Sequence, residues 1–87
     1  MDLQKLREQI DNIDDSILEL FKMRLNMVGM VAEYKKQNNL PILNAERERE
    51  ILERICSECD VAVKGYAERL FNTIMELSRT YQEGLIR

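Results

Sequence analysis

A cationic side chain interrupts the apolar stripe that runs through the first third of the chain. Large apolar side chains recur at steps of three and four between Leu3 and Tyr34, which is the spacing of one face of an α-helix. Arg24 occupies a position where this pattern predicts a core residue, and Lys35 lies beside the end of the stripe. Because burial of a charge without a partner is costly, Arg24 predicts an anion nearby, supplied by the protein or by a ligand.

Two polar side chains interrupt a second apolar stripe near the end of the chain. Ser78 stands where a core residue is expected, and Gln82 follows one turn later on the same side. Side chains of this kind need hydrogen-bond partners when they face inward. Each residue also has an ordinary explanation when taken alone. Arg24 can pair with an acid across a dimer, and Lys35 can be solvated. Ser78 and Gln82 can form hydrogen bonds to neighbouring backbone.

The periodicity and the turn residues predict three helices and no strand. The first spans about residues 2–37 and ends in the segment 38–41, because its proline disfavours helix in the preceding residue. Asn44 is a suitable N-cap for a second helix, which fades near residues 59–60, and a third begins around residues 64–66. The predicted fold class is all-α, with one long, one short and one medium helix.

Length and composition exclude several classes of protein. The 87 residues predict a single domain, 1–87, and 45% of them are hydrophobic while 33% are charged. The formal net charge of -3 argues against a nucleic-acid surface. No uncharged run approaches the ~20 residues of a membrane span. We therefore expect a cytoplasmic protein that binds neither nucleic acid nor membrane.

The length of the first predicted helix indicates a second copy of the chain. About 36 residues at ~1.5 Å rise make a rod of roughly 54 Å, whereas a compact chain of this size has a radius of gyration near ~12 Å. The apolar stripe follows nearly the whole rod, so the overhanging part needs another surface. We expect an intertwined antiparallel homodimer, in which Arg7 of one copy lies beside Arg24 and Lys35 of the other.

Together, the polar residues and their neighbours give the chain a resemblance to a known family. In chain order, the matching residues are Leu6-Arg7-Glu8-Gln9-Ile10, Arg24, Lys35, Pro41, Arg47-Glu48-Arg49, Leu70-Phe71, Ser78 and Gln82. Over almost the entire chain they resemble the all-helical chorismate mutases. The resemblance implies an intertwined homodimer of three-helix chains that isomerises chorismate to prephenate, on the route to phenylalanine and tyrosine.

The resemblance also implies which residues bind the substrate, a dicarboxylate. Arg24, together with Arg7 from the other copy, would hold the carboxylates through charge-assisted hydrogen bonds. Arg47 and Ser78 would support these two arginines in holding the carboxylates. The reaction is a unimolecular rearrangement, so the resemblance implies neither a metal nor a cofactor.

The remaining roles concern the reacting bond and the substrate ring. Lys35 and Gln82 would donate to the ether oxygen, which gains negative charge as the C–O bond breaks. Glu48 would accept a hydrogen bond from the ring hydroxyl. Asn44 stands at the start of the second helix, where the family often has aspartate. A contact through its backbone N–H would make this difference small, whereas a need for a carboxylate would weaken binding.

Two other functions stay open from the sequence. One is an isochorismate-pyruvate lyase on the same fold, and the other is a non-enzymatic helical dimerisation module, which would need none of the inward polar residues. Cys56 and Cys59 form a C-x-x-C pair, but the chain has no histidine and no further cysteine. A structural zinc site needs four ligands, so we expect two reduced thiols.

Overall fold

Each helix begins at a residue whose side chain accepts a hydrogen bond from the backbone of the first turn. The computed structural model describes residues 2–86, and within them it has three helices, α1 (Leu3–Gln37), α2 (Ala45–Ser57) and α3 (Val61–Leu85). Their N-caps are Asp2, Asn44 and Asp60. The predicted all-α class is confirmed, and the two ends of the predicted domain, residues 1 and 87, lie outside the described residues.

The boundaries of the helices agree with the prediction except at the start of α3. α1 ends at Gln37, where Asn39 adopts a positive φ of 55° and the N–H of Leu40 donates to the carbonyl of Lys35 over 2.8 Å. The predicted start of the third helix at residues 64–66 is wrong, because α3 begins at Val61. The cap at Asp60 explains the earlier start, since its carboxylate accepts from the N–H of Val63.

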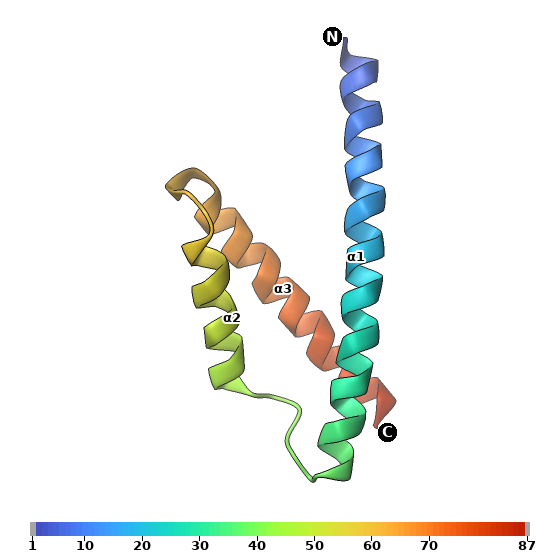
Figure 1. The fold of residues 1–87 in the computed structure, drawn as a ribbon, viewed down its shortest axis with the longest axis vertical. Helices are drawn as coiled ribbons and strands as arrows, with labels where there is room; N and C mark the ends of the chain where they lie inside the picture. Colours follow the sequence, from blue (N-terminus) through green and yellow to red (C-terminus); the bar gives the residue numbers. More distant parts are fainter. Residues whose placement is uncertain (1, 87) are drawn as a thin grey trace.

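α3 holds the other two helices together. It packs against the C-terminal half of α1 on one side and against α2 on the other, whereas no Cα atom of α2 lies within 8 Å of a Cα atom of α1 in the described residues. In Figure 1, α2 and α3 form an antiparallel pair, and the N-terminal half of α1 extends beyond them. The three helices therefore come together through α3, beside the C-terminal half of α1.

The core of the single chain is small, and the apolar stripe of α1 is largely uncovered. The buried apolar residues among those described are Ala32, Ile51 and Met75. Every residue from 2 to 20 is exposed, with Ile13 and Ile17 near 58% and 57%. The chain measures 54 × 26 × 14 Å, and its radius of gyration of 16.1 Å exceeds the ~12 Å of a compact chain. The long, partly unburied rod expected from the sequence is confirmed.

The three helices also bear on membrane association. Among residues 2–86, none of them combines the length and the apolar character that crossing a bilayer requires.

Candidate functional site

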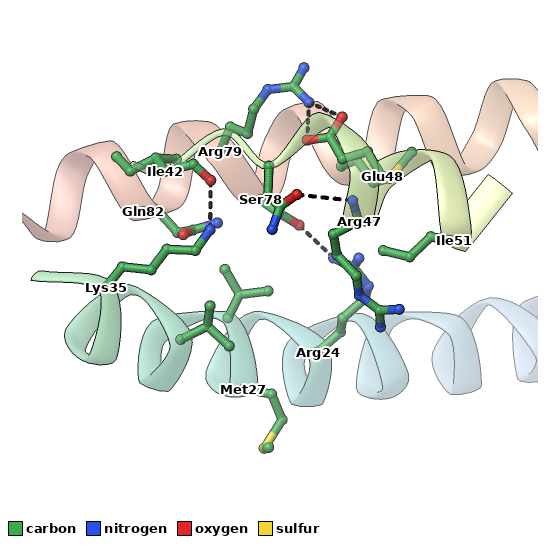
Figure 2. Close-up of a pocket in the computed structure, with 14 residues that line it drawn as sticks. Arg24, Met27, Lys35, Ile42, Arg47, Glu48, Ile51, Ser78, Arg79 and Gln82 are labelled. Carbon is green, nitrogen blue, oxygen red and sulfur yellow. Dashed lines mark hydrogen bonds and ion pairs between the residues drawn. The ribbon is translucent and has the colours of Figure 1, made fainter. Parts of the chain in front are cut away.

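The predicted site residues converge on one cavity between the three helices. This cavity has a volume of about 240 Å³, at the small end of ligand pockets, and it opens where α1, α2 and the end of α3 approach one another (Figure 2). The predicted residues that line it are Arg24, Lys35, Asn44, Arg47, Glu48, Ser78 and Gln82. Arg7 does not line it.

Arg24 reaches the cavity from α1 and has no carboxylate partner in the described part of the chain. Its guanidinium donates to the hydroxyl of Ser78, which donates in turn to the carbonyl of Ile74 over 2.8 Å. Burial lowers the pKa of Arg24, and the neighbouring charge of Arg47 lowers it further. The two cations therefore lie near each other, and Arg24 is partly desolvated. Such an arrangement favours an anion as the missing partner.

Lys35 and Gln82 lie at the other end of the cavity. The ammonium of Lys35 donates to the carbonyl of Ile42 over 2.6 Å and so fixes the connection between α1 and α2. Two of its three donors stay available for a ligand. Gln82 is 6% exposed, and its side-chain Oε1 has no hydrogen-bond partner among residues 2–86. Figure 2 shows the two side chains directed toward each other.

The start of α2 places Arg47 and Glu48 at the cavity. The Oδ1 of Asn44 accepts a hydrogen bond of 3.0 Å from the N–H of Arg47, which satisfies one of the free donors of the first turn. The side chain of Asn44 thus caps α2, as the sequence predicts. The guanidinium of Arg47 forms no ion pair with any described carboxylate.

Glu48 has a partner that sequence reasoning missed. The Nη1 of Arg79, on α3, lies 2.6 Å from both carboxylate oxygens of Glu48. This hydrogen bond raises the pKa of Arg79, and the charge of Glu48 also contributes. Arg79 does not interrupt an apolar stripe, which is the signal that identified Ser78. The sequence offered two other signals for Arg79 as the partner of Glu48. Arg79 directly follows Ser78, and Glu48 needs a cation as its partner.

Arg7 lies in the first turns of α1, and it is exposed. Figure 1 places this end of α1 far from the part that packs on α3. One chain therefore does not bring Arg7 to its own cavity.

The cysteine pair lies apart from this site. Cys56 and Cys59 are free thiols of intermediate exposure around the end of α2, and neither lines the cavity. The reduced state of the two thiols stays a prediction from the sequence.

The charges of the cavity define the class of ligand that it suits. Arg24, Lys35 and Arg47 have no carboxylate partner among the described residues, and the one lining carboxylate, Glu48, is paired with Arg79. An excess of positive charge in a chain of net charge -3 favours a small, multiply charged anion. Fold and cavity together define an all-helical protein with a cationic pocket between its helices.

Comparison with known proteins identifies the family to which the chain belongs. The family model of chorismate mutase type II matches residues 6–83, and the chain belongs to this family. A chorismate mutase of Methanocaldococcus jannaschii is 34% identical over 84 residues, which cover 93% of this chain and 84% of that protein. A solved structure of a conserved hypothetical protein from Pyrococcus furiosus matches with a TM-score of 0.77 and 36% identity, covering 92% of this chain and 93% of that one.

Other relatives are much longer than this chain. A bifunctional chorismate mutase/prephenate dehydratase of Buchnera aphidicola is 37% identical over 87 residues, which are 98% of this chain and 23% of that protein. A protein of the same name from Aquifex aeolicus is 46% identical over 54 residues, 15% of its length. The chain thus spans about a quarter of these bifunctional relatives or less.

Proposed function

We propose that the chain is a chorismate mutase, an isomerase that converts chorismate to prephenate. The observation that carries the proposal is the half-buried guanidinium of Arg24, which has no carboxylate partner in the described residues and lies near Arg47 at the cavity. A dicarboxylate substrate supplies the missing negative charge. Family membership supports the same assignment.

Binding of the two carboxylates is the first task of the cavity. Arg24, already oriented by its hydrogen bond to Ser78, donates two hydrogen bonds to one carboxylate in a bidentate contact, and Arg47 adds positive charge beside it. In the proposed dimer, Arg7 of the second copy binds the other carboxylate. Holding both ends of the substrate fixes the chair-like shape that brings the reacting carbons together, which lowers the entropic part of the barrier.

Stabilisation of developing charge is the second task. In the rearrangement the ether C–O bond breaks while a C–C bond forms, and the ether oxygen gains negative charge without any proton transfer. Lys35 and the side-chain amide of Gln82 line the same end of the cavity and donate to this oxygen. These donors act more strongly on the transition state than on the substrate, because the charge that they meet appears only as the bond breaks.

The ring hydroxyl of chorismate is assigned to Glu48. A carboxylate has about four acceptor positions, so Glu48 can accept from a hydroxyl while it stays bonded to Arg79. Asn44 contributes by capping α2, which fixes the backbone from which Arg47 and Glu48 extend.

The working unit is an intertwined antiparallel homodimer in which residues 1–87 of each copy form one domain. The exposed apolar stripe of α1, which includes Leu6, Ile10, Ile13 and Ile17, supports this proposal, because apolar residues at helical spacing stabilise a helix only when another surface covers them. A second α1 packed antiparallel would cover the stripe and carry Arg7 to the cavity of its neighbour. The cytoplasmic location stays a prediction from the sequence.

Identification of products is the experiment that tests the proposed reaction. Purified protein is offered chorismate and isochorismate separately, and we expect prephenate from chorismate. Release of pyruvate from isochorismate, without prephenate from chorismate, would indicate the lyase. Failure to convert either compound, or to bind a dicarboxylate transition-state analogue, would indicate a dimerisation module.

A substitution in the cavity links the activity to this site. Lys35→Ala removes a donor to the ether oxygen, so we expect turnover to fall on the order of a hundredfold or more. Circular dichroism and the mass of the assembly should not change. Lys36→Ala is the matched control, because Lys36 lies in the same helical turn but does not line the cavity. Near-normal turnover of Lys35→Ala would remove this residue from the mechanism.

A further inference from the structure

We infer that Arg79 is a positioning residue for Glu48. It directs the carboxylate of Glu48 toward the ring of the substrate and away from the cations that bind the carboxylates of the substrate. The inference rests on the proposed function for the identity of the ligand. Arg79 acts through Glu48 rather than on the reacting atoms. Without it, Glu48 would compete with the substrate for the anion-binding cations.

The geometry of the pair supports this role. A single nitrogen of Arg79, Nη1, lies 2.6 Å from both oxygens of Glu48, so the carboxylate is held symmetrically by one donor group. Both side chains are partly buried, with exposures of 32% for Arg79 and 25% for Glu48. In Figure 2 the carboxylate of Glu48 points toward Arg79 and away from Arg24. The contact is shielded more than the surface pairs that Arg49 makes within α2.

The surrounding charges explain why Glu48 needs to be held. Arg24 and Arg47 line the same cavity and have no carboxylate partner in the described chain. A free carboxylate on the first turn of α2 would be drawn to these cations, because opposite charges attract strongly in a partly desolvated space. It would then occupy the place of a substrate carboxylate. Arg79 offers Glu48 a competing partner on α3.

The consequence for recognition concerns the position of the hydroxyl on the ring. A carboxylate held by Arg79 presents its remaining acceptor positions in fixed directions, so it distinguishes a ring that carries a hydroxyl within reach of them from one that does not. A partly buried acceptor of this kind discriminates because one of its acceptor positions loses its partner when the hydroxyl is absent. Arg79 thereby contributes to specificity without contacting the hydroxyl itself.

The test measures binding rather than turnover. The probes are two bicyclic dicarboxylates that mimic the transition state and differ only in the presence of the ring hydroxyl, and their affinities are measured by calorimetry on the assembled protein. The variants are Arg79→Met, Arg79→Lys, Glu48→Gln and the double variant Arg79→Met with Glu48→Gln. Arg49→Met is the control, because it also loses an ion pair on α2 but does not line the cavity.

Arg79→Met should weaken binding of the probe without the hydroxyl on the order of tenfold, because Glu48 then competes for the cations. The double variant should regain the affinity of Glu48→Gln within about twofold, since neutral glutamine does not compete. Arg79→Lys should keep most of the affinity, and preference for the hydroxylated probe should be lost in Arg79→Met.

Two results would overturn the inference. Unchanged affinity and preference in Arg79→Met would show that Glu48 does not depend on Arg79. Equal weakening in Arg79→Met and in the double variant would show that Arg79 only clamps α2 to α3. Conversion of chorismate by the unsubstituted protein is measured alongside, so a failure of the proposed reaction is seen separately from either result.

Discussion

At the scale of single residues, the cavity is built from polar side chains that occupy positions where apolar ones would pack equally well. Ser78 and Gln82 are each 6% exposed, yet Ser78 is bonded to Arg24 and its own helix whereas the Oε1 of Gln82 has no partner among residues 2–86. An unpartnered buried acceptor costs stability. Such a cost marks Gln82 as a candidate for function, and the ether oxygen, which is itself an acceptor, would bond to its amide N–H rather than to Oε1.

Replacement of Gln82 by glutamate tests whether this side chain donates to the ether oxygen. Gln82→Glu can donate only while its carboxyl group is protonated, so activity should be present in acid and fall as the pH rises through the pKa of the new carboxyl. The ionised form would also repel the charge that develops on the oxygen. Activity of the parent should be nearly flat across neutral pH. Steady-state rates measured from acid to neutral pH check this, and identical profiles for parent and variant would exclude the contact.

The residues of the site differ in how far the sequence could reveal them. Arg24 and Ser78 were identified because each interrupts an apolar stripe, and periodicity makes such interruptions visible. Arg79 and the carbonyl of Ile42 belong to no stripe and were missed. Their importance depends on which atoms meet across different helices, and that depends on crossing angles and side-chain rotamers that one sequence does not specify.

At the scale of elements, the first turn of α2 decides where several site residues point. Asn44 caps this turn through its side chain, and Arg47 and Glu48 follow within four residues. The cap was predictable because Asn is a favoured N-cap residue. The start of α3 at Val61 was not predicted, because Val61 and Val63 are exposed and add no helical periodicity, so the cap at Asp60 was the only signal.

Two substitutions of Asn44 separate a capping role from a direct contact with substrate. Asn44→Ala removes the cap, so the free energy of unfolding should fall by about 1 kcal/mol and KM should rise more than kcat changes. Asn44→Asp keeps an acceptor for the N–H of Arg47 but adds negative charge, so stability should be kept while dicarboxylate binding weakens. Urea unfolding and kinetics at one protein concentration check both. Tighter binding by Asn44→Asp would show that a carboxylate is preferred there.

At the scale of the whole molecule, every residue in the N-terminal half of α1 is exposed in the described chain. The length of the rod and its uncovered stripe were predictable, since both follow from the rise per residue and the apolar periodicity. The packing of α2 on α3 alone, and the resulting space beside α1, were not. Helix pairing depends on the relative strength of alternative contacts, which local patterns do not rank.

Mixed assemblies test the proposed sharing of each cavity between two copies. Arg7→Ala and Lys35→Ala dimers should each be poorly active, because every cavity lacks one cation. When the two variants are unfolded together and refolded at equal concentration, about half of the dimers are mixed, and each mixed dimer has one intact cavity. We expect roughly a quarter of the parent activity to return. Activity that stays at the level of the separate variants, with mixed dimers confirmed by mass, would contradict the antiparallel arrangement.

The exposed first half of α1 also sets how the protein reaches its native state. Most of the stability of a helix in a protein comes from packing of its apolar face, so in the proposed dimer residues 3–20 gain much of their order from the encounter with the second copy. In the proposed dimer, the final step of folding is therefore bimolecular, and its half-time shortens as the chain becomes more concentrated. Dilution lengthens the wait for a partner, and the time for which each chain exposes its apolar stripe lengthens with it.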